Sequence, residues 1–168
     1  VRNGCVQKGQ ETVVQNSSGW WYIGTDGKVD FHKNTVAPNE YGWWAVRNGA
    51  VDFQLNGIAS NESGDWYCRG GQVDFGAAGV LESETEGFSG WYYIQNGCVQ
   101  KGQETVKQNS NGWWYIGTDG KVDFGFSGIA SNENGTWYIE NGKVNFTYSG
   151  TYEDENGRIY DIKSGNVA

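Results

Sequence analysis

The fold is set by one stretch of sequence, Gly19-Trp20-Trp21-Tyr22-Ile23-Gly24-Thr25-Asp26-Gly27-Lys28-Val29-Asp30-Phe31. It contains two short runs of Trp, Tyr, Ile, Val and Phe, which are the residue types enriched in β-strands. Between the runs lies Asp26-Gly27, a pair that tolerates the positive φ angles of a tight hairpin turn. The stretch therefore predicts a β-hairpin over residues 19–31.

The same pattern recurs along the chain at intervals of about 22 residues. The valine of its second strand stands at positions 29, 51, 73, 99, 122 and 144, and a degraded copy covers 157–168. A single hairpin is only marginally stable in water, so neighbouring copies must stack to bury their apolar sides. We therefore predict an all-β chain, an elongated β-solenoid of stacked β-hairpin repeats, in which polar connectors such as residues 56–63 are linking loops.

A longer repeat is superimposed on the short one. Residues 1–13 return almost unchanged as residues 94–106, and the offset of 93 residues still relates Phe31 to Phe124. This predicts two long repeat units: 1–93, with four hairpins of which the first is truncated, and 94–168, incomplete at the C-terminus. Because the sequence shows neither an initial methionine nor a leader, we expect the chain to be a piece of a larger protein.

The composition excludes several functional classes. The chain has 9 Trp, 10 Tyr and 7 Phe, a formal net charge of −8 and no cluster of basic residues. This argues against nucleic acid as a partner, since phosphate binding needs clustered Lys and Arg. No apolar run approaches the roughly 20 residues that cross a bilayer, so we expect no membrane insertion. With so little Leu, the core has to be built from aromatic rings.

Strand alternation predicts which side chains form that core. Trp21 and Ile23 share one side of the first strand, and the Trp21 position is large and apolar in every copy of the repeat. Val29 and Phe31 face the same way, as do Val51 and Phe53 and later pairs. We therefore predict that this column of residues is the core.

The opposite side of the strand carries the candidate ligand-binding residues. The Trp20 position also accepts Asp65, Thr136 and Arg158, so the sequence predicts that it faces solvent and that its tryptophans are not required by the fold. Exposed rings there would suit sugars, quaternary ammonium groups or a protein partner, or would simply cover the next connector. The predicted site residues are Trp20, Tyr22, Trp43, Trp91, Tyr93, Trp113, Tyr115 and Tyr138.

Catalytic chemistry finds little support in the sequence. The one histidine, His32, has Gly125 as its counterpart one long repeat later, so no general base repeats with the unit. Asp30 and Asp52 begin a column of carboxylates that would be either a calcium ladder or a solvated face opposed by lysines. No loop has the dense Asp and Asn spacing of a calcium motif. We predict no enzyme activity, no cofactor and no metal site.

The three cysteines leave two interpretations open. Cys5 and Cys98 are equivalent positions one long unit apart, whereas Cys68 and Cys98 lie in adjacent hairpins. A disulfide between Cys68 and Cys98 would suit a secreted protein. Thiols packed as small apolar side chains are the alternative.

Two motifs carry a resemblance to known proteins: Gly-Trp-Trp-Tyr-Ile at 19–23, and Gly-Ile-Ala-Ser-Asn-Glu-Asn-Gly-Thr-Trp-Tyr-Ile at 128–139. They resemble the aromatic and glycine repeats of Gram-positive surface proteins, namely cell-wall-binding repeats similar to choline-binding, glucan-binding and clostridial toxin receptor-binding repeats. The resemblance implies a hairpin solenoid that binds choline, glycans or host proteins without catalysis. Choline-binding modules complete each aromatic cage with a residue of the following hairpin, often Met or another ring, and this chain has no Met.

Three functional hypotheses follow. The first is a non-catalytic bacterial surface adhesin that recognises a host protein or glycoprotein, immunoglobulin being one candidate, through exposed aromatic positions. The second is a cell-wall or glycan-binding module, for glucan or choline, that anchors the parent protein. The third is a spacer that holds another domain away from the wall. In each case the resemblance implies a secreted or wall-attached protein outside the cell.

Overall fold

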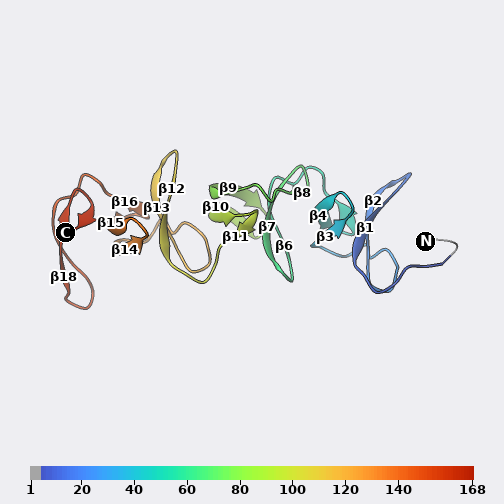
Figure 1. The fold of residues 1–168 in the computed structure, drawn as a ribbon, viewed down its shortest axis with the longest axis horizontal. Coiled ribbons are helices and arrows are strands. Elements are labelled where there is room, and N and C mark those ends of the chain that lie inside the picture. The colour runs from blue at the N-terminus through green and yellow to red at the C-terminus, as the bar shows by residue number, and fades with distance from the viewer. Residues whose placement is uncertain (1–4) are drawn as a thin grey trace. The chain divides into compact units, whose positions relative to one another are not determined.

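In the computed structural model, which describes residues 5–168, every regular element is a β-strand (Figure 1). The strands are β1 (Thr12–Asn16), β2 (Gly19–Ile23), β3 (Thr35–Asn39), β4 (Gly42–Arg47), β5 (Ala50–Val51), β6 (Gly57–Asn61), β7 (Gly64–Arg69), β8 (Gln72–Val73), β9 (Gly79–Thr85), β10 (Phe88–Gln95), β11 (Cys98–Val99), β12 (Thr105–Asn109), β13 (Gly112–Ile116), β14 (Gly128–Asn132), β15 (Gly135–Glu140), β16 (Lys143–Val144), β17 (Gly150–Glu153), β18 (Ile159–Lys163) and β19 (Asn166–Val167). Within residues 5–168, no helix is long and apolar enough to cross a membrane.

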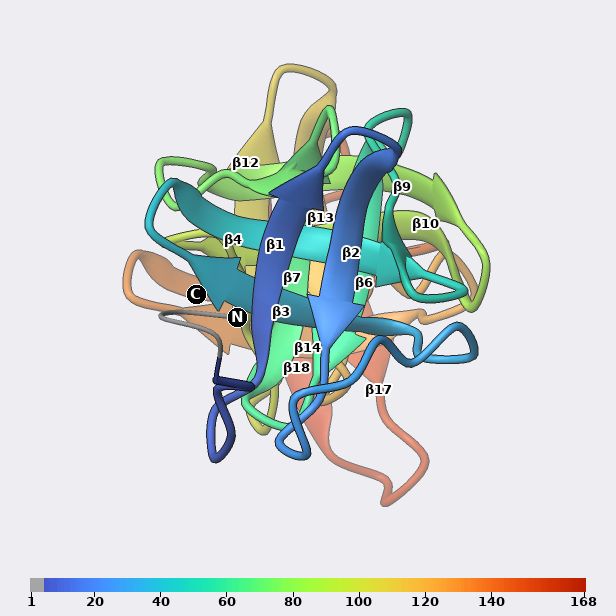
Figure 2. The ribbon, with the colours of Figure 1, turned by 90° about the vertical axis from the view of Figure 1, so that its right-hand side faces the viewer.

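The chain forms two compact units, which are described separately. Unit 1 contains Val1–Ala77, Ser83–Ser89 and Asn96–Cys98, and unit 2 contains Ala78–Glu82, Gly90–Gln95 and Val99–Ala168. In unit 1 the hairpins β1–β2, β3–β4 and β6–β7 follow one another, and in unit 2 the hairpins are β12–β13, β14–β15 and β17–β18. Figure 2 shows β1 and β2 lying across β3 and β4, so successive hairpins of unit 1 are turned relative to one another. The predicted all-β solenoid of stacked hairpins is confirmed.

Five of the seven repeats have three strands, one more than the sequence predicted, and in the repeats of β1–β2 and β12–β13 the third strand is reduced to an isolated bridge at Val29 or Val122. Strand β7 pairs with β6 through five registered residues and with the two-residue strand β8 through the Gly70-Gly71 turn. The predicted linking loop 56–63 is therefore wrong, because Gly57–Asn61 is strand β6. The polar side chains of this segment led to the prediction of a loop. Its apolar residue Ile58 is 1% exposed and lies in the core.

Backbone contacts at the turn glycines join one hairpin to the hairpin before it. Gly142 has a φ of 76°, and a Cβ at this position would overlap the carbonyl oxygen of Asp123. The Gly142 carbonyl accepts a 2.8 Å hydrogen bond from the backbone N–H of Tyr115. The same contact joins Tyr22 to Gly49, Ala45 to Gly71, Tyr67 to Gly97, Tyr93 to Gly120 and Tyr138 to Gly165, with N to O distances of 2.7–2.9 Å. Only a residue without a side chain brings the two backbones this close.

In five of the repeats an asparagine anchors the tryptophan at the Trp21 position. In the β14–β15 hairpin, Asn132 Oδ1 accepts hydrogen bonds from the Trp137 indole N–H at 3.0 Å and from the Asn134 backbone N–H at 2.9 Å. Its Nδ2 donates to the carbonyl of Val106, one hairpin earlier, at 2.9 Å. The matching pairs are Trp21 with Asn16, Trp44 with Asn39, Trp66 with Asn61 and Trp114 with Asn109. The asparagine thus fixes the ring that forms much of the core.

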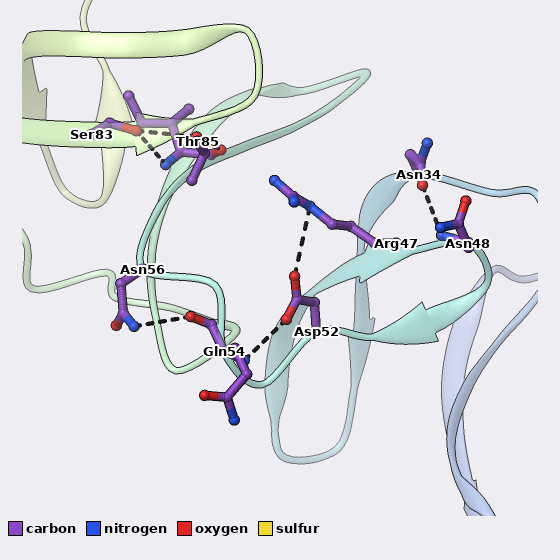
Figure 3. Close-up of polar contacts among 9 residues, drawn as sticks. Asn34, Arg47, Asn48, Asp52, Gln54, Asn56, Ser83 and Thr85 are labelled. Atoms are coloured by element: carbon purple, nitrogen blue, oxygen red, sulfur yellow. Dashed lines mark hydrogen bonds and ion pairs between the residues drawn. The ribbon is translucent and has the colours of Figure 1, made fainter.

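The predicted core was correct for five of the six valines, since Val29 is half-buried, and wrong for the phenylalanines. Val51 and Val122 are 8% and 2% exposed, whereas Phe31 and Phe53 are 58% and 44% exposed. Strand alternation fails because β5 ends at Val51 and the chain then turns. Asp52 sets that turn, since its Oδ1 accepts the Gln54 N–H at 3.0 Å (Figure 3).

The carboxylate column is structural. Asp52 also lies 3.7 Å from Arg47 Nε, and Asp74 Oδ2 accepts a 2.8 Å hydrogen bond from Arg69 Nε, so arginines, and not the expected lysines, face these two residues. Figure 3 shows the first of these pairs beside the turn contact from Asn48 N–H to Asn34 Oδ1. Within the described residues no group of three His, Cys, Asp or Glu side chains is placed to hold a metal ion.

The disulfide interpretation is wrong, since Cys68 and Cys98 are not joined. Cys98 is registered opposite Trp66, and its Sγ lies against Gly64, on the far side of Trp66 from Cys68. Cys68 is fully buried, and burial raises the pKa of its thiol to about 12. It packs as a small apolar residue beside Val36 and Val73.

The turn contact predicts a large difference between two glycine substitutions. Gly142→Ala and Gly102→Ala both place alanine at a positive φ, which costs roughly 1 kcal/mol. Only Gly142→Ala also drives a methyl group into backbone, and we expect this to cost roughly 1–3 kcal/mol more. Urea unfolding of the two variants measures the difference. Equal free energies of unfolding would contradict the proposed role of the turn glycine.

Candidate functional site

Three aromatic rings from two consecutive hairpins meet in unit 1. Trp20 of β2 lies with its ring centroid 5.0 Å from that of Trp44 of β4 and 5.8 Å from that of Phe53, which follows β5. The Trp44 and Phe53 centroids are 5.7 Å apart. We call this group cluster A.

The same group recurs once more in unit 1 and twice in unit 2, with centroid distances of 5.0–5.9 Å. Its members are Trp43, Trp66 and Phe75 in cluster B, Trp91, Trp114 and Phe124 in cluster C, and Trp113, Trp137 and Phe146 in cluster D. Each cluster takes one tryptophan from the first hairpin and a tryptophan and a phenylalanine from the second.

Within a cluster the three rings differ in depth. We call the tryptophan that the second hairpin contributes, and that its asparagine holds, the floor ring of the cluster. The floor rings of clusters A and C, Trp44 and Trp114, are 9% and 8% exposed, whereas the four cluster phenylalanines are 44–48% exposed. The rings are tilted or perpendicular to one another, so within a cluster the edge of one ring points toward the face of another. Aromatic faces carry negative potential and attract cations. A surface group of three rings in a chain of net charge −8 therefore suits a cation that has no hydrogen-bond donors.

The four predicted tryptophans are each placed in a different cluster. Trp20, Trp43, Trp91 and Trp113 belong to clusters A, B, C and D. They are half-buried and pack against the core clusters of their units. The expectation that this column is surplus to the fold is therefore wrong, because each of these rings covers the anchored tryptophan of the next hairpin.

The four predicted tyrosines lie elsewhere. Tyr22 and Tyr115 are 2% and 5% exposed, so the expectation that they face solvent is wrong. Tyr115 stacks on Phe126 at 3.8 Å, Tyr138 lies 4.5 Å from Tyr148, and Lys107 Nζ lies 5.2 Å above the ring of Tyr93. Tyr22 belongs to the core cluster against which Trp20 packs, and it is not one of the three rings of cluster A.

Sequence reasoning missed the second and third ring of every cluster. Trp44 and Phe53 had been assigned to the core, although Phe53 recurs as Phe75 after 22 residues, in step with the tryptophans. A second signal was the asparagine five residues before each anchored tryptophan. It marks the ring that is held in place, and so the ring that forms the floor.

The buried tyrosines stay neutral at ordinary pH. Burial and a hydrogen bond with the Glu104 carboxylate raise the pKa of Tyr115 to about 12, and the same two causes, with Glu11, raise the pKa of Tyr22. A cleft of about 480 Å³ in unit 1 is lined by Glu11, Tyr22, Asp30 and other residues of that hairpin. A tyrosine so held is a poor proton donor, which offers no support for acid–base catalysis at this cleft.

A model of the choline-binding repeat matches residues 11–30, 33–52, 56–74, 89–100 and 125–145, which together are more than half of the chain. No curated protein sequence matches. Among solved structures, CbpJ from Streptococcus pneumoniae TIGR4 is similar with a TM-score of 0.40 and 19% identity, over 94% of this chain and 52% of that one.

Two further similar structures are choline binding protein F from Streptococcus pneumoniae and the modular Cpl-1 endolysin complexed with a peptidoglycan analogue. The first has a TM-score of 0.39 and 18% identity, over 96% of this chain and 51% of that one. The second has a TM-score of 0.34 and 18% identity, over 98% of this chain and 41% of that one. The chain thus spans about half the length, or less, of these solved structures.

The raised pKa of Tyr115 predicts a loss of stability in alkali. The folded state holds the phenol proton more tightly than the unfolded state, whose tyrosines titrate near pH 10. The resulting stabilisation is complete below pH 10 and is lost as the pH rises from about 10 to about 12. In Tyr115→Phe this part of the decline disappears, as urea unfolding between pH 8 and 11.5 would measure. An unchanged decline would exclude Tyr115 as its source.

Proposed function

We propose that this chain, which belongs to the choline-binding repeat family, is a non-catalytic wall-binding module that holds choline or related quaternary ammonium groups in its aromatic clusters. The observation that carries the proposal is the repeated group of three rings with an exposed phenylalanine. The ligand would be presented by the bacterial cell wall, so the module would act outside the cell and anchor its parent protein there.

The chemistry of the ligand fits the rings. A trimethylammonium group has a positive charge and a methyl surface but no N–H, so hydrogen-bonding side chains cannot recognise it and aromatic faces can. Cluster A offers two indoles and one phenyl ring within 6 Å of one another, with Phe53 open to solvent. Each ring facing such a cation contributes about 0.5–2 kcal/mol.

The absence of methionine does not weaken the proposal. Choline-binding modules complete a cage with a residue of the following hairpin, and in cluster A that hairpin supplies both Trp44 and Phe53. The ring that closes the group is therefore present, although it is a phenylalanine.

Repetition favours a polymeric ligand. Each unit carries two clusters, and the cell wall displays its ligands many times along a polymer. Linked weak sites gain avidity without new contacts, provided the spacing allows simultaneous binding. A module with individually weak clusters would thus be held firmly on a wall and be released by free choline.

The host-protein hypothesis, which the sequence ranked first, receives no support from family membership, and the same holds for immunoglobulin. The wall-binding hypothesis, ranked second, is favoured by it. The expectations of an extracellular location and of a wall partner are in keeping with the family and form part of this proposal.

Titration with choline and with 3,3-dimethylbutanol, its uncharged isostere, tests the proposal. We expect millimolar-range choline binding by calorimetry, much weaker binding of the alcohol, and release of wall-bound protein by choline. Phe53→Ala should weaken the binding at cluster A by roughly 3- to 30-fold, since it removes one ring from the cation.

Phe31→Ala is the matched control. Phe31 is 58% exposed and lies 5.7 Å from Trp21, in a pair of rings with no third member among the described residues. Its replacement should leave choline binding unchanged. Equal losses in both variants, or equal binding of choline and the alcohol, would overturn the proposed cation site.

A further inference from the structure

The four clusters differ in one residue that lies over the floor tryptophan. Each floor ring is registered across the sheet from the first residue of a two-residue strand, and these pairs are Trp44 with Gln72, Trp66 with Cys98, Trp114 with Lys143 and Trp137 with Asn166. The partner side chain extends along the tryptophan toward the glycine two residues before it. A Cβ at Gly112 would overlap Lys143 Cε, and a Cβ at Gly42 would overlap Gln72 Nε2.

In cluster C this residue places a positive charge on the floor ring. Lys143 Nζ lies 5.1 Å from the ring centroid of Trp114, within the range of a cation–π contact. In the described part of the chain, no carboxylate forms an ion pair with Lys143. No ion pair with a described residue therefore offsets the ammonium group beside the rings that would receive a ligand cation.

Cluster A has a neutral amide at the same position and gains a fourth ring. Gln72 Nε2 donates a 2.8 Å hydrogen bond to the carbonyl of Tyr41, whose ring lies 6.0 Å from Trp20 and is 65% exposed. At the Tyr41 position the other repeats have serine or asparagine, for example Asn111 in cluster C. Cluster A thus has more aromatic surface and no fixed cation.

We propose that Lys143 is a specificity-determining residue that closes cluster C to quaternary ammonium ligands, while Gln72 leaves cluster A open. The ammonium acts in either of two ways. If it lies on the face of Trp114 that the ligand would contact, it occupies the ligand's place. If it lies on the opposite face, it repels the ligand cation through the ring. Both lower the affinity of cluster C. The inference rests on the proposed function and assigns unequal roles to two clusters that the repeat would make equivalent.

Exchanging the two residues tests the inference in proteins that retain one cluster each. Phe53→Ala with Phe75→Ala and Phe146→Ala weakens the other clusters and leaves only cluster C with all three rings, and Phe75→Ala with Phe124→Ala and Phe146→Ala does the same for cluster A. These rings are 44–48% exposed, so their removal should leave the fold intact, as circular dichroism and thermal unfolding would verify. Choline affinity is then measured by calorimetry.

In the protein that retains cluster C, Lys143→Gln should raise the affinity for choline by roughly 3- to 10-fold. Lys143→Arg, which keeps the charge, should leave it low. In the protein that retains cluster A, Gln72→Lys should lower the affinity by a similar factor. Lys28→Gln removes the same charge from an exposed position of unit 1 and should not change binding at cluster C.

The two proposals fail in different ways. Absence of choline binding in the wild-type chain and in the protein that retains cluster A would overturn the proposed function and this inference with it. Binding through cluster A, with no gain at cluster C on Lys143→Gln, would overturn the inference alone. An equal gain from Lys28→Gln would do the same, because it would show an effect of net charge and not of position.

Discussion

The hydrogen bond between a turn glycine and the preceding hairpin is the contact on which the rest of the structure depends. At Gly142 and its equivalents, a backbone carbonyl accepts the N–H of a residue one hairpin earlier, and the glycine lies directly on backbone. A side chain there would separate the hairpins. Because single hairpins are marginal in water, their stacking through this contact is what makes each unit stable.

The same contact creates the candidate site. It fixes each hairpin at a constant offset from the one before. Trp20 therefore contacts Trp44 of the following hairpin, the ring that Asn39 holds in place. The phenylalanine is exposed because the strand before it is very short, two residues in cluster A and an isolated bridge in cluster C, and the chain turns before the ring can enter the core. The short strand thus leaves one ring of each cluster exposed to solvent.

The clusters of the different repeats are similar but not identical. The backbone contacts are the same in every complete repeat, whereas the residue over the floor ring varies from glutamine to cysteine, lysine and asparagine. The side chain at that position crosses a glycine, and its contacts differ between repeats: Gln72 donates to the Tyr41 carbonyl, whereas Lys143 lies over the Trp114 ring. Variation there changes the charge beside a cluster while the strand pairing stays the same, and the proposed difference between clusters A and C rests on this change.

The sequence by itself determined the β class, the hairpin period and the long repeat, because turn glycines and β-forming rings recur at a spacing that only stacked hairpins satisfy. It also identified one ring of every cluster, Trp20 and its equivalents. It missed strand β6, whose residues look like a polar loop, and it placed Phe53 in the core because strand alternation does not reveal where a strand ends. Only the tertiary structure decided which rings meet. Each cluster joins residues of two hairpins, and backbone contacts between the hairpins set their relative rotation. The sequence pattern within one hairpin does not reveal that rotation.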